Sequence, residues 1–94
     1  PNECVAKIRQ LDATAVVGNH DWAALGQMDV DDFNPAARLA VTWTREHLSH
    51  ASLVWLGSLS REPLVKGEFT LTDGSPRGPI WEYILYPSTA RANF

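Results

Sequence analysis

The spacing of hydrophobic positions predicts helices that alternate with short strands. Residues 1–11 carry apolar side chains at helical spacing, and Pro1 stands at a position that helix starts favour. The segment Thr14–Val17 is apolar and rich in β-branched residues, which is typical of a short buried strand in a parallel or mixed sheet. A helix, a tight link, a strand and a polar loop in succession indicate an α/β architecture.

The middle of the chain predicts two further helices. After one expected helical turn at 22–26 and a polar loop at 27–33, Asn34 and Pro35 form a typical helix start, with asparagine as the N-cap. Apolar residues then recur at helical spacing to about residue 48, and a second helix is expected over Ser49–Leu59. We expect these two helices to form a hairpin that packs against the sheet.

The last third predicts a β-hairpin, a rigid loop and a final helix. Two short strands are expected at Glu62–Lys66 and Glu68–Thr72, around a Lys-Gly turn. The following segment, residues 73–79, is rich in glycine and proline and predicts a loop. A helix is expected over Ile80–Leu85 and should end before Pro87, because the residue before proline avoids helical geometry. Residues 88–94 are left open between a further helical turn and a fraying end.

Composition and charge narrow the possible functions. With 94 residues, of which 45% are hydrophobic, the chain is at most one globular domain, and its first residue, Pro1, suggests an internal or processed segment. A net charge of −3 and dispersed basic residues predict no binding to a nucleic-acid backbone. The sequence has neither a membrane-spanning run nor a signal-peptide pattern, and Cys4 has no partner for an internal disulfide. We therefore expect a cytoplasmic protein that does not bind membranes.

The strongest functional signal is Gly18–Asp21, an amide, an imidazole and a carboxylate directly after the expected strand. Polar side chains at the end of a strand line the rim where α/β proteins bind ligands. Asn19 offers a neutral oxygen for a metal, and His20 could donate a hydrogen bond to a phosphate or protonate a leaving alkoxide. Asp21 could orient the His20 ring by accepting from its other nitrogen. The alternative is a plain turn with Asn19 in the left-handed conformation and His20 merely exposed.

Gly-Asn-His-Asp is also a signature of the calcineurin-like metallophosphoesterases, which this chain resembles in four segments: residues 1–5, 18–21, 34–46 and 74–83. The resemblance implies part of a four-layer αββα sandwich and hydrolysis of a phosphomonoester or phosphodiester with two divalent ions such as Mn, Fe or Zn. By the same resemblance, Asn19 is a metal ligand, His20 works on the phosphate of a small-molecule substrate, and Asp21 is the supporting residue. The substrate stays open between a nucleotide, a dinucleotide, a cyclic diester and a protein phosphate.

Two departures from the family pattern qualify the resemblance. The strand before Gly-Ser-Pro normally delivers a histidine ligand, and Asp73 stands there instead. Asp73 is therefore either a metal ligand of different character or an ordinary first residue of the Gly74 turn. The family's Asp-x-His, Gly-Asp-x-x-Asp and Gly-His-x-His motifs are absent from these residues. We expect residues 1–94 to be an internal portion of a single metallophosphoesterase domain, inactive without the remaining ligands.

Two other interpretations stay open. The chain could be a degenerate, non-catalytic family member or a binding module, or the fold could be unrelated and the motif fortuitous.

Among the remaining polar residues, Asp29, Asp31 and Asp32 are expected in a solvated loop, and His47 and His50 at the surface or in packing. Trp22 could line the substrate mouth, and Arg77 could meet a phosphate. Three tryptophans are expected in the core: Trp43, Trp55 and Trp81.

Overall fold

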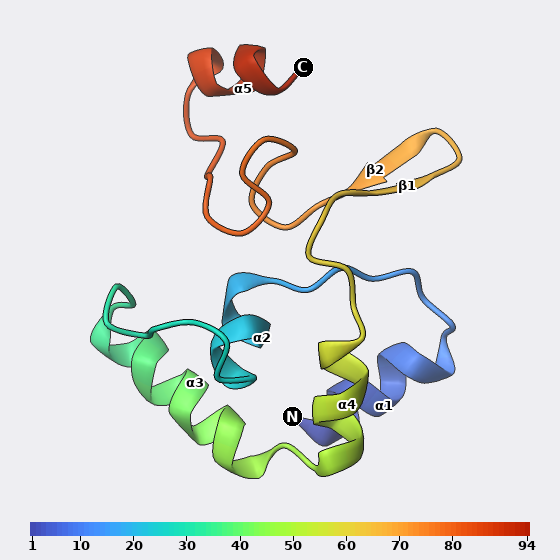
Figure 1. The fold of residues 1–94 in the computed structure, drawn as a ribbon, viewed down its shortest axis with the longest axis vertical. Helices are drawn as coiled ribbons and strands as arrows, with labels where there is room; N and C mark the ends of the chain where they lie inside the picture. Colours follow the sequence, from blue (N-terminus) through green and yellow to red (C-terminus); the bar gives the residue numbers. More distant parts are fainter.

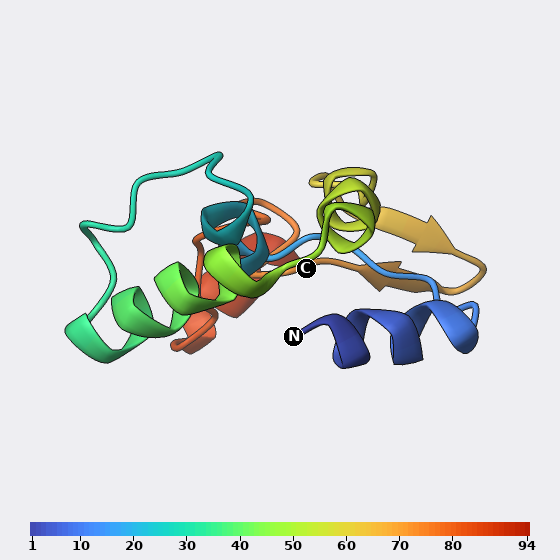
Figure 2. The ribbon, with the colours of Figure 1, turned by 90° about the horizontal axis from the view of Figure 1, so that it is seen from below.

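Five helices and one two-stranded hairpin make up the chain, and the computed structural model describes all 94 residues. In chain order the elements are α1 (Asn2–Gln10), α2 (Asn19–Ala24), α3 (Pro35–His47), α4 (His50–Gly57), β1 (Leu64–Lys66), β2 (Phe69–Leu71) and α5 (Pro87–Asn93) (Figure 1). They form a flat body of 39 × 34 × 17 Å, whose thin direction is seen in Figure 2. None of the helices is long and apolar enough to cross a membrane.

Helix α1 packs on α4 and is tied to the junction between α3 and α4. Val5, Leu48 and Leu56 meet in a small buried cluster between them. The Asn2 side chain donates to the carbonyl of His47 at 2.8 Å and accepts from the N–H of Ser49, also at 2.8 Å. One asparagine therefore satisfies two polar groups where one helix ends and the next begins.

Helices α3 and α4 and their N-caps are confirmed, but the prediction that the two helices pack together as a hairpin is wrong. Asn34 accepts from the N–H of Ala37, and Ser49 accepts from the N–H of Ser52. Yet α3 packs on α2 while α4 packs on α1, so the two helices diverge from their junction (Figure 1). Leu48 adopts an extended conformation (ψ 130°) and is buried beside α4, and this turns the chain away from a tight antiparallel return.

The strand predicted at Thr14–Val17 is also wrong. Only one parallel bridge forms, between Val16 and Ser60, supported by the Val17 N–H donating to the Ser60 carbonyl at 3.0 Å. A strand needs a partner along its whole length, and within this chain the only bridging partner is Ser60, a loop residue beyond the end of α4. Val17 is nevertheless 1% exposed, so the expected burial of this segment is correct at that position.

The β-hairpin is confirmed, with β1 and β2 antiparallel in the register Leu64↔Leu71 and Lys66↔Phe69. Gly67 has a φ of 60° in the turn, a conformation that glycine adopts without strain. The hairpin extends away from the helices (Figure 1), and Val65 and Phe69 are 71% and 75% exposed. The helices are therefore not layered on this sheet, contrary to the expectation.

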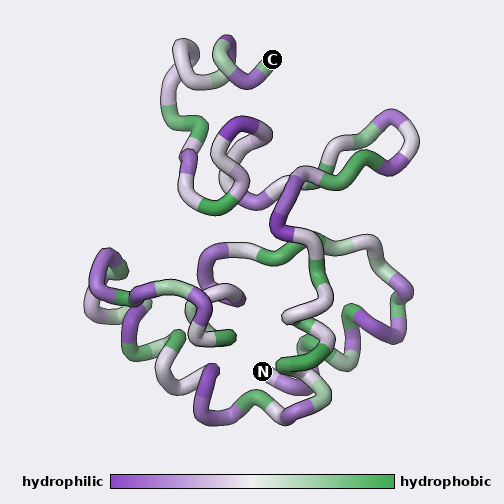
Figure 3. The backbone as a smooth tube through the Cα atoms, in the orientation of Figure 1, coloured by the Kyte–Doolittle hydropathy of each residue, from purple (hydrophilic) through white to green (hydrophobic).

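The helix expected at Ile80–Leu85 is wrong, and the final helix lies further along the chain. Residues 79–81 form a single turn and the chain then runs without regular structure to Tyr86. Pro87, expected to stop a helix, instead opens α5 from the N1 position, where its missing N–H costs nothing. Hydrophobic residues occur in nearly every segment of the chain (Figure 3). The prediction that Trp43 and Trp81 lie in the core is wrong, because both side chains are exposed.

Candidate functional site

The motif Gly18–Asp21 forms the first turn of helix α2, not a turn that precedes it. Gly18 is the N-cap, with an extended backbone (φ −105°, ψ 173°), and Asn19 is the first helical residue. The alternative with Asn19 in the left-handed conformation is wrong, because Asp12 is the only non-glycine residue with positive φ. A Cβ added at Gly18 would lie 3.1 Å from the carboxyl group of Asp73, so glycine allows that side chain to approach closely.

Asp21 does not orient His20 in this structure, which corrects the role expected for it. Its Oδ2 accepts from the N–H of Gly18 at 3.0 Å, the reciprocal hydrogen bond that an acidic residue in the first turn makes with the N-cap. Adjacent residues on a helix do not face each other, so this carboxylate is directed away from its neighbour. Asp21 therefore holds the start of the helix that presents Asn19 and His20.

Asp73 comes to the same helix start from 54 residues further along the chain. Its Oδ2 accepts from the N–H of Asn19 at 3.1 Å, while Oδ1 of Asn19 accepts from the N–H of His20 at 3.0 Å. A carboxylate is favourable there because the first N–H groups of a helix lack partners within the helix. The fold thus brings together the two residues that the sequence suggested as metal ligands, and gives Asp73 a capping contact that its place before Gly74 did not predict.

His20 is exposed, and an aromatic ring supports one of its faces. The imidazole stacks on Phe33 with the ring centroids 4.9 Å apart and the planes 29° apart. Phe33, only 7% exposed, also contacts the ring of Trp81 edge-on at 5.6 Å. These rings border a pocket of about 210 Å³ whose lining includes Asn19, His20, Phe33, Trp81 and Tyr83. The candidate catalytic imidazole therefore lies at the rim of a small, partly aromatic hollow.

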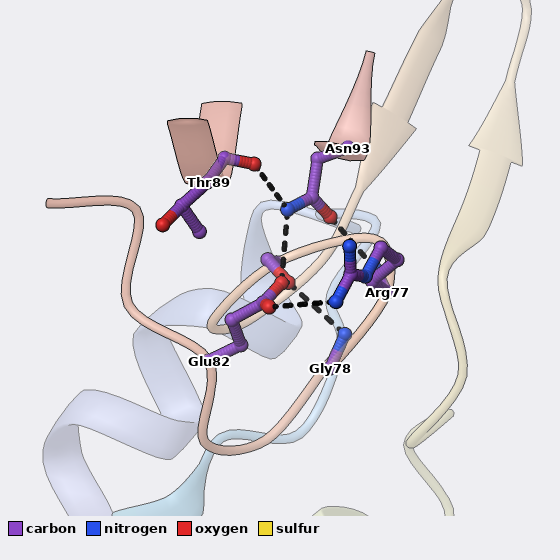
Figure 4. Close-up of polar contacts among 6 residues, drawn as sticks. Arg77, Gly78, Glu82, Thr89 and Asn93 are labelled. Carbon is purple, nitrogen blue, oxygen red and sulfur yellow. Dashed lines mark hydrogen bonds and ion pairs between the residues drawn. The ribbon is translucent and has the colours of Figure 1, made fainter. Parts of the chain in front are cut away.

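The loop that carries Asp73 is held by a polar cluster that sequence reasoning missed (Figure 4). Ser75, fully buried, donates to Oε2 of Glu82, and the same oxygen accepts from the Asn93 amide at 2.9 Å. The Arg77 guanidinium lies 3.6 Å from Oε1 of Glu82. Gly74 closes the loop with φ 59°, and a Cβ there would lie 2.8 Å from the Gly78 carbonyl. No local spacing signals this cluster, because its members are brought together from the loop and from α5.

This polar cluster should make the stability of the folded protein depend on pH. The hydrogen bonds from Ser75 and Asn93, and then the charge of Arg77, lower the pKa of Glu82 below its ordinary value of 4.5. The stability that this charge contributes is therefore present above pH 4.5 and is lost as the pH falls through the lowered pKa. In thermal unfolding of the whole protein, Glu82→Gln should lower the melting temperature at neutral pH, and the gap to wild type should close in acid. A gap that does not change with pH contradicts this assignment.

Several other candidates lie away from the pocket. Trp22 does not line it but packs under Arg61, whose guanidinium carbon is 4.5 Å from the ring centroid. Arg77 is engaged by Glu82 and does not reach His20's pocket either. His47 ends α3 and His50 begins α4, so the two do not share one continuous helix. In the acidic loop, Asp29 accepts from the N–H of Asp31 at 2.9 Å, as expected of a solvated turn.

A metal ion fits this chain only in part. Nowhere in the chain do three or more His, Cys, Asp or Glu side chains gather closely enough to hold one. The amide oxygen of Asn19 and the carboxylate of Asp73 are the oxygen donors that hard divalent ions accept, and they belong to neighbouring segments. The donor set therefore suits a share of a metal site and not a complete one.

Comparisons with known proteins identify the fold to which this site belongs. The chain matches no family model. Over 98% of its length it superposes on the crystal structure of a metallophosphoesterase from Sphaerobacter thermophilus, with a TM-score of 0.79 and 45% identity. The chain has the fold of part of a metallophosphoesterase. The interpretation of an unrelated fold with a fortuitous motif is therefore wrong.

A second relative is also similar to this chain over nearly its whole length. An uncharacterized protein of Methanocaldococcus jannaschii is 40% identical over 89 residues, which are 90% of this chain. The chain spans 38% of the Sphaerobacter structure and 37% of the Methanocaldococcus protein, less than two fifths of either. The mixed helical and strand architecture described above corresponds to that share of the metallophosphoesterase fold.

Proposed function

We propose that the whole protein containing this chain is a metal-dependent phosphoester hydrolase that acts on a small-molecule phosphomonoester or phosphodiester. The observation that carries the proposal is the approach of Asp73 to the helix start that bears Asn19 and His20, across 54 residues of chain. The 45% identity to a metallophosphoesterase over nearly the whole chain supports it independently. Residues 1–94 are then an internal portion of one metallophosphoesterase domain.

In this proposal the chain contributes two oxygen donors and one proton donor. The oxygens of Asn19 and Asp73 would hold divalent metal, two ions of the Mn, Fe or Zn type in the whole site. When bound, such ions supply an activated water and neutralise charge on the phosphoryl oxygens. His20, exposed at the rim of the pocket, donates to a phosphate oxygen or to the leaving alkoxide.

Asp21 acts indirectly in this proposal: it accepts from the Gly18 N–H and so stabilises the first turn of α2.

A cytoplasmic location also remains part of the proposal. Cys4 is unpaired and exposed, which suits a reducing compartment.

A second candidate function is a degenerate member that binds without hydrolysing. It is favoured by the replacement of the expected histidine by Asp73, and by the hydrogen bonds that both oxygen donors already make within the chain. Oδ2 of Asp73 is engaged by Asn19, and Oδ1 of Asn19 is engaged by His20. In this alternative Asp73 is only a cap for α2.

The experiment that separates the two is hydrolysis of an aryl phosphomonoester and an aryl phosphodiester by the whole protein with Mn²⁺. Turnover that EDTA removes and added Mn²⁺ restores supports the hydrolase. Turnover that survives exhaustive EDTA treatment contradicts metal dependence. The absence of turnover with Mn²⁺, Fe²⁺ and Zn²⁺ alike would favour the binding module.

A further inference from the structure

We infer that Phe33 is the residue that positions the His20 imidazole for work on the phosphate, in the role first expected of Asp21. The inference rests on the proposed function for its catalytic meaning, because His20 is assigned to the phosphate there. Its structural content, that the Phe33 ring sets the orientation of the imidazole, stands on the stacking geometry alone.

Phe33 can position a partner because its own ring is fixed. It is 7% exposed and belongs to a buried cluster with Ala23 of α2 and Val41 of α3. Its backbone N–H donates to the Val30 carbonyl at 3.0 Å, and the next residue, Asn34, caps α3. A ring held by both helices has few alternative rotamers, so it presents one constant face.

His20 needs such a support because nothing else in the chain holds its ring. The residue is exposed, and neither ring nitrogen makes a hydrogen bond to the chain. Asp21, the carboxylate next to it, is engaged by the N–H of Gly18. The stack on Phe33 at 4.9 Å is therefore the contact that restricts the two side-chain torsions of His20.

Stacking also suits the proposed chemistry. A stacked contact covers the plane of the imidazole and leaves both nitrogens, which lie on the ring edge, free to form hydrogen bonds. A carboxylate partner would occupy one nitrogen, whereas an aromatic partner occupies neither. His20 thus keeps a defined orientation and leaves both ring nitrogens available for hydrogen bonds at the rim of the pocket.

The kinetic test uses the whole protein with Mn²⁺ and an alkyl phosphoester. Phe33→Leu and Phe33→Met fill similar volume without a ring and should lower kcat by about 10- to 100-fold with little change in KM. Phe33→Tyr keeps the ring and should restore most of kcat. Leu56→Ala opens a cavity in the separate cluster between α1 and α4, which contains neither Phe33 nor His20, so it should lower the melting temperature but leave kcat near wild type. If kcat falls equally in Leu56→Ala and in the ring-free variants, Phe33 is only structural and the inference fails.

The spectroscopic test does not depend on activity. In a histidine-labelled NMR spectrum, the His20 ring protons should carry a ring-current shift that Phe33→Leu and Phe33→Met abolish and Phe33→Tyr preserves. A His20→Gln spectrum assigns the signal. Unchanged ring shifts in the ring-free variants overturn the inference, and so does an unchanged kcat. If the wild type hydrolyses no phosphoester, the proposed function fails, and the ring shifts still decide whether Phe33 sets the orientation of His20.

Discussion

Replacing His20 by alanine in the whole protein should lower kcat for phosphoester hydrolysis by roughly 10²- to 10⁴-fold, the usual contribution of a positioned proton donor. The structure makes this a clean substitution. His20 is exposed, its ring makes no hydrogen bond to the chain, and it lies on the first turn of α2, which Gly18 and Asp21 hold through backbone and carboxylate. The melting temperature should therefore change little, so that a loss of activity reports on chemistry and not on folding.

The choice of substrate separates the two roles open to His20. If it protonates the leaving alkoxide, His20→Ala should damage the hydrolysis of an alkyl ester far more than that of a p-nitrophenyl ester, whose leaving group needs no proton. If it donates only to a phosphate oxygen, both esters should suffer equally. His50→Ala is the matched control, because His50 is also exposed but opens α4 and does not line the pocket. Wild-type turnover of both esters by His20→Ala would end the catalytic assignment.

Asp73 should prove to be both a cap and a ligand, and two substitutions separate these functions. Asp73→Asn keeps an oxygen that can accept from the Asn19 N–H but loses the negative charge. It should weaken the affinity for Mn²⁺ by roughly 10- to 100-fold, with a melting temperature near that of wild type. Asp73→Ala removes the acceptor as well, and should also lower the free energy of unfolding by about 1–2 kcal/mol.

The measurements are Mn²⁺ titration by calorimetry and by activity, alongside chemical unfolding of the same proteins. Asp12→Asn is the control, because Asp12 has a φ of 48°, a conformation in which asparagine is well tolerated, and it is exposed. If Asp73→Asn binds Mn²⁺ as wild type does while Asp73→Ala loses only stability, Asp73 is a cap alone. That result would favour the degenerate, non-catalytic alternative.

Elements with local start and stop signals were predicted correctly. Asn34 with Pro35, and Ser49, are residues whose side chains or rings satisfy the first N–H groups of a helix by themselves. The hairpin at Gly67 likewise needs only a turn and two short apolar strands. Such features depend on neighbours a few residues away, so a sequence contains all the information that they require.

Elements that depend on distant partners were not predicted. Thr14–Val17 has the composition of a strand but only one bridging partner, Ser60, in this chain. The segment Ile80–Leu85 has helical spacing, but the Glu82 carboxylate is drawn to Ser75 and Asn93, and the chain leaves the turn at that point. In the first segment a modest local preference lacked a partner strand, and in the second it was outweighed by contacts from elsewhere in the fold.

The sequence by itself determined which chemistry was present: an amide, an imidazole and a carboxylate in one tetrapeptide, and a second carboxylate at Asp73. Only the tertiary structure decided what each of them touches. It directed Asp21 to the Gly18 N–H, brought Asp73 to Asn19, and placed the His20 ring on Phe33. The physical reason is that residue types and short-range spacing are properties of the chain, whereas the partner of a side chain depends on how separate segments pack.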